Sequence, residues 1–280
     1  EAHLINEVRL RVSVDAGFNF YRALLLWYGI PAGVVVGCSG GNGLMKSRKQ
    51  GFGYNERLFS GGIRSHLHLA RFHWFVDAVN RLGCPTDSVL ELGCFDGKLL
   101  DFIKTRPSRY VGFDANWEGG LDKGRARWAD RVGYSFFKVT APEEIQLADS
   151  DVFQLAVAME TLEHVEPAMV DGYLRVIAAH LDGYLFVTVP NEMGPVFLLK
   201  WLAKRFLNGD AHEFSFAELV NSAFYRSSRV RRNQHKGFDY RCLLAEIGRY
   251  FTVLEVSGHP LGFMPPSLCF GVGIIARSKA

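Results

Sequence analysis

The chain of 280 residues is 48 % hydrophobic and 22 % charged, with a formal net charge of +3 at pH 7. These values exclude a disordered chain, and so small a charge does not by itself indicate a nucleic-acid partner. None of the five cysteines forms a C-x-x-C pair. This argues against a disulfide framework or a structural zinc site and favours a reducing, cytoplasmic location.

The first part of the chain differs from the rest. Residues 1–64 are expected to form an N-terminal extension or lid, and residues 65–280 a single domain. The extension contains the apolar run ALLLWYGIPAGVVVGC at 23–38, which is interrupted by Pro31 and is shorter than the about 20 residues that span a bilayer. Apolar residues at helical spacing then predict a helix over 63–83, with Gly83 at its end.

From residue 88 onward, apolar runs alternate with amphipathic segments. The predicted strands are 88–92, 110–114, 135–139, 152–158 and 184–189, and the predicted helices are 97–105, 120–130, 167–181 and 195–207. Two further strands, 250–258 and 268–278, follow each other without a helix and should therefore pair antiparallel. The predicted fold is α/β, a Rossmann-like doubly wound sheet of seven strands, mostly parallel with an antiparallel last strand.

A glycine-containing turn follows the first predicted strand in VLELGCFDG, residues 89–97. Gly93 and Gly97 permit a positive φ and, lacking a Cβ, let a ligand approach the backbone. The next strand ends at Asp114, where a carboxylate can accept hydrogen bonds from both hydroxyls of a ribose. The turn lacks the G-x-G-x-x-G pattern of dinucleotide sites, and Asp96 would repel a phosphate. A nucleoside without phosphates, S-adenosylmethionine, therefore fits better than a hydride-transfer cofactor.

Four segments in this order, VLELGCFDG, YVGFDAN, DVFQLAVAMETLEHV and LFVTVPN, resemble the class I S-adenosylmethionine-dependent methyltransferases. The resemblance covers roughly residues 66–277 and implies seven strands, the last antiparallel. The cofactor-binding residues that it implies are Glu91, Gly93, Cys94 and Gly97 at the methionine end, Asp114 and Ala115 at the ribose, and Val139, Thr140 and Ala141 beside the adenine. The chain departs from the family pattern at Phe95, in place of a glycine, and at Thr140 and Ala141, where an Asp often contacts the adenine amino group.

The segment METLEHVEP follows the fourth predicted strand and contains Glu160, Glu163 and His164. If the chain turns helical there, the spacing i, i+3, i+4 places all three on one face. They could then bind a divalent metal. Alternatively, His164 with Glu163 beside it could be the catalytic base that removes a proton from an acceptor hydroxyl, or the two residues could simply hold the loop together.

The pattern E-x-x-E-H resembles the metal-binding motif of the small-RNA 3′-terminal 2′-O-methyltransferases and the corresponding segment of ubiquinone-pathway O-methyltransferases. In the small-RNA enzymes a later histidine completes the site, and here His235 precedes a predicted helix in RNQHKGFDYRCLLAEI. The resemblance implies a site for Mg²⁺, Mn²⁺ or Zn²⁺ formed by Glu160, Glu163, His164 and His235. A metal-free His164 base is the alternative.

Three segments bear on the acceptor. The run YRSSRVRRNQHK at 225–236 gathers basic residues that suit phosphate contacts, although a solvated basic face is the simpler explanation. FLLKWLAKRFL at 197–207 could lie on an anionic membrane surface, or cover the acceptor pocket with Trp201 in the core. His66, His68 and His73 spread around their predicted helix, so at most one should line the pocket.

Residues 188–206 and 235–247 resemble bacterial methyltransferases associated with surface-polysaccharide and lipid-linked sugar synthesis. We therefore expect an O-methyltransferase that acts on a hydroxyl of a sugar, a lipid-linked or another small molecule, phosphorylated in some cases, in the cytoplasm or at its membrane surface. The arginines lack interleaved aromatic residues, which disfavours nucleic acid. The alternatives are a metal-dependent enzyme like the RNA 2′-O-methyltransferases and a non-catalytic cofactor-binding protein. The sequence predicts no oligomeric state.

Overall fold

The computed structural model describes residues 63–208, 214–233, 235–260 and 262–279. The expected extension, its apolar run at 23–38 and Cys38 lie outside these residues. The four cysteines within them form no disulfide with one another. In the described part of the chain, no helix is long and apolar enough to cross a membrane.

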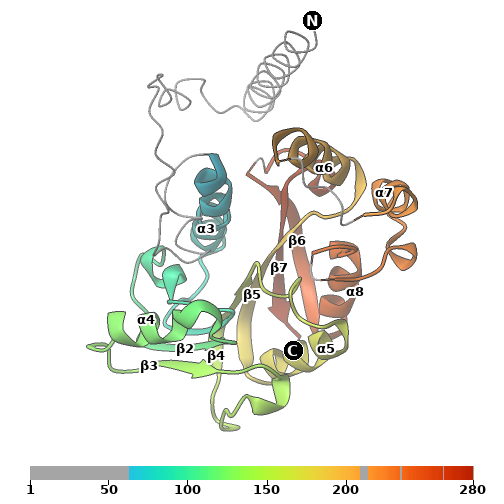
Figure 1. Ribbon diagram of the computed structural model, residues 1–280. Coiled ribbons are helices and arrows are strands. Elements are labelled where there is room, and N and C mark those ends of the chain that lie inside the picture. The colour runs from blue at the N-terminus through green and yellow to red at the C-terminus, as the bar shows by residue number, and fades with distance from the viewer. Residues whose placement is uncertain (1–62, 209–213, 234, 261, 280) are drawn as a thin grey trace, which may run out of the picture.

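One seven-stranded sheet organises the described residues (Figure 1). Its strands lie in the order β3-β2-β1-β4-β5-β7-β6. β1 to β5 run parallel, and β7 is antiparallel to both of its neighbours, which confirms the predicted fold class. The bounds are β1 Ser88–Leu92, β2 Arg109–Asp114, β3 Tyr134–Lys138, β4 Phe153–Met159, β5 Leu181–Pro190, β6 Phe251–His259 and β7 Gly271–Ser278.

Helices cover both faces of the sheet (Figure 1). On one face lie α3 Ile63–Leu82, the short η2 Lys98–Asp101 and α4 Gly120–Arg127, whose buried residues share one core cluster. On the other face lie α5 Pro167–Ala179 and α8 Tyr240–Tyr250, which pack against a second cluster. The remaining helices are α6 Gly194–Asn208, α7 Phe216–Ala223 and single turns η3 Trp117–Gly119, η4 Pro142–Glu144, η5 Ser227–Arg229 and η6 Pro266–Leu268.

The helix predicted over 97–105 is wrong, because only the single turn η2 forms there. Gly97 enters that turn in the left-handed conformation, with φ 71°. Pro107 then disfavours helical backbone at the residue before it, so the turn cannot grow into a helix. The other predicted elements agree with the observed ones to within three residues at each end. The boundary expected between residues 64 and 65 falls in the first turn of α3.

Gly183 on β5 lies beside an irregularity in the pairing of β4 with β5. A Cβ at this position would clash with the backbone carbonyl of Gln154. Gly183→Ala is therefore expected to lower the free energy of unfolding by about 1–3 kcal/mol in urea titration. Gly248→Ala on α8 is the matched control, because a Cβ there meets open space. That control should raise the free energy of unfolding by about 0.5–1 kcal/mol. If both variants changed it in the same direction, the predicted clash at Gly183 would be contradicted.

Candidate functional site

The expected site lies at the carboxyl ends of β1, β2 and β4, which are neighbours in the sheet. The chain runs outward from β1 to β3 on one side and outward from β4 on the other, so the strand order reverses between β1 and β4. Doubly wound sheets bind ligands at such a reversal. The ends of β1 to β4 and the loops that follow carry every predicted site residue except His235, which precedes α8.

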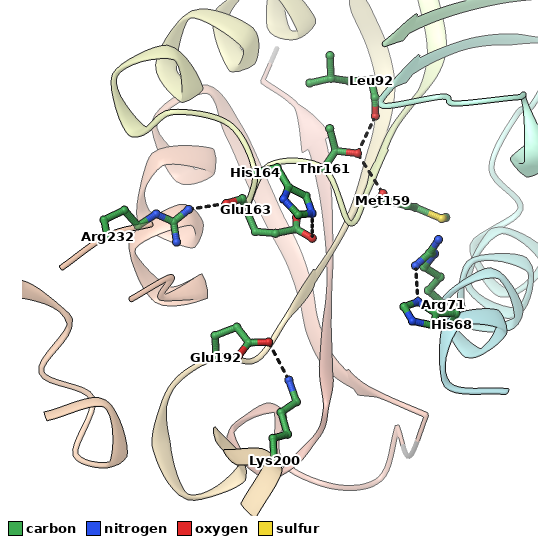
Figure 2. A network of polar contacts seen from close by, with 10 residues as sticks. All are labelled: His68, Arg71, Leu92, Met159, Thr161, Glu163, His164, Glu192, Lys200 and Arg232. Carbon is green, nitrogen blue, oxygen red and sulfur yellow. Dashed lines mark hydrogen bonds and ion pairs between the residues drawn. The ribbon is translucent and has the colours of Figure 1, made fainter. Parts of the chain in front are cut away.

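Thr161 fills the space that Gly93 leaves in the β1 loop. Gly93 and Gly97 adopt left-handed backbone, with φ of 77° and 71°. A Cβ on Gly93 would overlap the side chain of Thr161. The Thr161 hydroxyl lies 3.0 Å from the carbonyl oxygen of Met159 and 3.3 Å from that of Leu92 (Figure 2). The missing Cβ of Gly93 therefore makes room for Thr161 and lets the β1 and β4 loops pack against each other.

Glu91 is a buried carboxyl at the end of β1. It accepts a hydrogen bond from the hydroxyl of Tyr110 on β2. Burial raises the pKa of Glu91 to about 8, and the hydrogen bond from Tyr110 opposes this shift. The thiol of Cys94 is buried as well and packs against Gly112, so it belongs to the core and not to the surface of the loop.

The raised pKa of Glu91 should make stability depend on pH. Its contribution to stability is complete below the ordinary pKa of 4.5 and is lost as the pH rises to about 8. Glu91→Gln is expected to abolish this loss. The free energy of unfolding of the variant, relative to that of the wild type, should therefore rise by up to about 1.4 kcal/mol per pH unit within that window. Urea unfolding near pH 5 and pH 9 measures the gain, with Glu246→Gln on α8 as control. Parallel pH profiles for all three proteins would contradict it.

Asp114 joins the loops after β1 and β2. Its carboxylate oxygens accept hydrogen bonds from the backbone N–H groups of Phe95 (3.0 Å) and Asn116 (2.7 Å). The side chain is half-buried, and burial raises its pKa. Because a carboxylate offers about four lone pairs, Asp114 keeps acceptor capacity for two ribose hydroxyls. Ala115 follows directly and is partly buried.

Glu144 organises the loop after β3, where Val139, Thr140 and Ala141 were predicted to flank the adenine. Its carboxylate accepts hydrogen bonds from the backbone N–H groups of Thr140 (2.6 Å) and Ala141 (3.3 Å), and the first of these lowers its pKa most. Val139 is buried beneath them, while Thr140 is exposed. Sequence reasoning missed Glu144, although a Glu three residues after the N-cap of a helical turn, here Ala141, commonly accepts a hydrogen bond from the N-cap N–H.

The segment from Glu160 to His164 is a turn, so the helix on which a shared face of Glu160, Glu163 and His164 would depend does not form. Glu160 itself has a left-handed backbone, with φ 50°, which is strained for a residue with a Cβ. The N–H of His164 bonds to the carbonyl oxygen of Thr161 at 3.0 Å and closes the turn. Burial raises the pKa of Glu160, and the charges of Arg71 and Lys200 oppose this shift. The three residues thus do not share one helix face.

Glu163, His164 and His235 converge. One ligand atom of each lies within 4.8 Å of the others, and Glu160 is not part of this group. Glu163 is fully buried, neither of its carboxylate oxygens has a hydrogen-bond partner among the described residues, and Oε1 lies 3.7 Å from Nε2 of His164 (Figure 2). The rings of His164 and His235 are 4.3 Å apart. The structure therefore brings together three of the four predicted ligands, through contacts between the β4 loop and the segment before α8.

Burial favours the neutral forms of Glu163 and His164. Burial raises the pKa of Glu163 well above its usual range, and the nearby charge of Glu160 adds to this. Burial also lowers the pKa of His164 to about 4, with smaller contributions from His235 and Arg232. A neutral imidazole is the form that accepts a proton or binds a metal ion. The buried carboxyl of Glu163 lacks the partners that such groups normally have, and a bound cation would supply one.

Residues 66–242, more than half of the chain, match the family described as "Methyltransferase domain". The chain belongs to this family. It is an S-adenosylmethionine-dependent methyltransferase, as the four segments of the sequence predicted. Its cofactor is accordingly S-adenosylmethionine.

The methyltransferase is 28 % identical to a ubiquinone biosynthesis O-methyltransferase of Hahella chejuensis over 189 residues, which cover 61 % of this chain and 74 % of that protein. A solved S-adenosylmethionine-dependent methyltransferase from Clostridium acetobutylicum matches with a TM-score of 0.57 at 9 % identity, over 81 % of this chain and 99 % of that one. Magnesium protoporphyrin IX methyltransferase from Synechocystis, solved with bound SAH, matches with a TM-score of 0.50 at 15 % identity, over 80 % and 92 %. These two structures establish a common fold alone.

Two residues that sequence reasoning missed border the cluster of the methyltransferase. Arg232 donates a hydrogen bond of 2.7 Å from its guanidinium to the backbone carbonyl of Glu163 (Figure 2). The ring of Trp117, on the loop after Asp114, lies 6.4 Å from the ring of His164 and is 62 % exposed. Arg232 belongs to the basic run, so its charge was noticed, but only the packing of that run against the β4 loop reveals its contact.

Cations from two helices face the carboxyl groups of the methyltransferase site. Arg71 on α3 lies close enough to lower the pKa values of Glu91 and Glu160 against the larger effect of burial. Its guanidinium also contacts His68, one of the predicted pocket histidines, at 3.2 Å (Figure 2), while the side chain of His66 lies outside the described part of the chain. Lys200 on α6 pairs with Glu192 at 3.1 Å and donates to the carbonyl oxygen of Asn191. Lys200 thus points toward the end of β5.

Proposed function

We propose that the protein transfers the methyl group of S-adenosylmethionine to a hydroxyl oxygen of a small-molecule acceptor. The observation that carries the proposal is the cluster of Glu163, His164 and His235 beside the loops that the cofactor requires. An oxygen acceptor must lose its proton during transfer, and an imidazole that is neutral at physiological pH can take it. The similarity to a ubiquinone biosynthesis O-methyltransferase supports a small molecule with a hydroxyl group as the acceptor.

The cofactor would lie across the ends of β1, β2 and β3. Asp114 would bind the ribose hydroxyls, with Ala115 beside them, and Val139, Thr140 and Ala141 would flank the adenine. Glu91, Gly93, Cys94 and Gly97 would form the methionine end, the last three through the backbone of their loop. Arg71 is the cation suited to the carboxylate of the methionine moiety, because its charge already reaches the carboxyl of Glu91.

The cluster fits a divalent metal with two imidazole nitrogens and one carboxylate, a donor set that favours Mn²⁺ or Zn²⁺ over Mg²⁺. Glu163, His164 and His235 would hold the ion, whereas Glu160, which was predicted as a fourth ligand, lies outside the group. An ion held there would lower the pKa of a hydroxyl next to it. Arg232 would fix the orientation of the β4 loop through the carbonyl of Glu163.

The residues of the chain contribute mainly position, since the methyl group of a sulfonium transfers by in-line displacement. His164 would hold or receive the proton of the acceptor hydroxyl. Trp117, whose exposed ring stands beside His164, would form one wall of the space through which the acceptor enters. Arg232, whose guanidinium lies beside the β4 loop, suits an acceptor with an acidic or phosphorylated group, such as a sugar phosphate or a lipid-linked sugar of polysaccharide synthesis.

The test is transfer of labelled methyl from S-adenosylmethionine to three acceptor sets: sugar phosphates and sugar nucleotides, dihydroxybenzoates, and short RNA with a free 3′ end. Wild type and His164→Ala are compared with and without EDTA. Product with an O–CH₃ group, lost in the variant, supports the proposal. Transfer to RNA in preference to the small molecules, or to nitrogen, would overturn the acceptor class. Cofactor binding without transfer to any acceptor would favour a non-catalytic protein.

A further inference from the structure

Helix α7 presents an apolar stripe to solvent. Phe216, Val220 and Phe224 are spaced by four residues and therefore lie on one face of the helix and its end. Their exposed fractions are 83 %, 37 % and 69 %. The opposite side of the helix is held down by the buried Ser222. Large aromatic side chains are seldom left so exposed in a row, and a row of this kind marks an interaction surface. We call these three residues the α7 stripe.

The neighbouring elements extend the apolar surface. The ring of Tyr225 packs on Gly194 at the start of α6, and its hydroxyl lies 3.4 Å from the carbonyl oxygen of Ser267 in η6. The end of α7, the start of α6 and the turn η6 are therefore in contact. These three elements and the segment before η6 hold six of the eleven large hydrophobic residues that are exposed in the described chain, so the exposure is concentrated at one end of the sheet. The additional members are Leu198, Phe263 and Leu268.

The border of the α7 stripe is basic. Glu218 is the single acidic residue of α7, and it is neutralised by Lys236 at 2.8 Å and caps the helix through Ser215. The guanidinium of Arg226 lies 6.0 Å from the centre of the Phe224 ring and is exposed. Arg229 and Arg231 follow and are exposed as well. Exposed aromatic residues beside arginines are the combination that binds the interface of an anionic bilayer.

We propose that the α7 stripe docks on an anionic lipid surface, with Phe216, Val220 and Phe224 at the acyl boundary and Arg226 and Arg229 on the lipid phosphates. A second copy of this chain fits less well, because a symmetric contact through the stripe would bring Arg226 close to its own counterpart. The sequence had suggested α6 for this role, but its Lys200 is occupied by Glu192. Since α6 begins shortly after β5, the docked surface adjoins the carboxyl end of β5 (Figure 1).

The experiment is cosedimentation of the full chain with sucrose-loaded vesicles of phosphatidylcholine alone or with about one third phosphatidylglycerol. Wild type should bind the anionic vesicles, and raising the salt to about 0.5 M should release it. Phe216→Ser/Phe224→Ser and Arg226→Glu/Arg229→Glu should each reduce the bound fraction at least about fivefold. Val132→Ser/Val152→Ser is the matched control, because both valines are exposed but precede β3 and β4, at the amino ends of the parallel strands and away from α6 and α7.

Calorimetry with S-adenosylmethionine on the same variants separates docking from the transfer reaction, because none of the substituted residues belongs to the proposed site. Intact cofactor binding with lost vesicle binding supports the proposal. The proposal is overturned if the wild type does not bind anionic vesicles, or if the stripe variants bind them as well as the wild type does. A dimer that dissociates in Phe216→Ser/Phe224→Ser, without vesicle binding, would identify a second copy as the occupant and overturn the lipid assignment.

Discussion

Asp114→Ala is expected to weaken the binding of S-adenosylmethionine by about 100-fold or more, because two hydrogen bonds from ribose hydroxyls to a charged group are worth about 1.5–3 kcal/mol each. The carboxylate also bridges the loops after β1 and β2 through the N–H groups of Phe95 and Asn116. Part of the loss should therefore reflect a less ordered site. Isothermal titration of the purified variant with the cofactor measures the effect directly.

Two further variants separate the ribose contact from the loop contact. Asp114→Asn keeps an acceptor oxygen but loses the charge, so it should lie between wild type and Asp114→Ala. Asp122→Ala on α4 removes an exposed carboxylate that pairs with Arg125 at 3.2 Å, and it should leave the affinity unchanged. If Asp114→Ala binds the cofactor like wild type, the ribose assignment fails. A lower melting temperature without a change in affinity would show that Asp114 only stabilises the loops after β1 and β2.

His235→Ala is expected to abolish the uptake of Mn²⁺ or Zn²⁺ and to lower the rate of methyl transfer by about 100-fold or more, since loss of a direct ligand exceeds the 10–100-fold effect of outer-shell changes. Glu163→Gln should do the same, because the buried carboxyl is the sole oxygen donor of the cluster among the described residues. Titration with each metal after dialysis against EDTA measures uptake, and labelled methyl transfer measures the rate.

Glu160→Gln is the matched control for the metal site. It changes a partly buried carboxyl three positions before Glu163, but Glu160 is not within ligand distance of the cluster. Metal uptake should persist in this variant. Loss of uptake in Glu160→Gln would restore the four-ligand site that the sequence suggested. If wild type takes up no metal and transfers methyl in EDTA, His164 acts as a metal-free base, and His235→Ala should then have a smaller effect on the rate.

Local sequence patterns predicted the structural features that depend on residues close together in the chain. The alternation of apolar runs with amphipathic segments predicted the strands, and the absence of a helix between the last two predicted their antiparallel pairing. Asp114 was located because it ends a strand, whereas His235 was assigned through the resemblance to the small-RNA methyltransferases, in which a histidine precedes a late helix. The helix over 97–105 failed for a local reason too, since Gly97 and Pro107 limit that segment to one turn.

The spacing of residues in the sequence could not predict which side chains form the site. The pattern E-x-x-E-H places three side chains together only on a helix, and the left-handed backbone of Glu160 turns that residue out of the group. Arg232 and Trp117 lie beside the cluster because segments that are far apart in the sequence are in contact there. The same holds for Thr161, which fills the space above Gly93.

The sequence by itself determined the order of strands and helices, the loop with its two glycines, and the residue types at the strand ends, because backbone conformation follows from residues that are close in the chain. The tertiary structure alone decided which of these side chains meet, because the distances between them depend on strand order and on how loops pack over the sheet. Burial then set their charge. Nothing in the sequence distinguishes the charge state of Glu163 and His164 from that of other titratable residues. Burial between the β4 loop and the segment before α8 raises the pKa of Glu163 and lowers that of His164, so both favour their neutral forms.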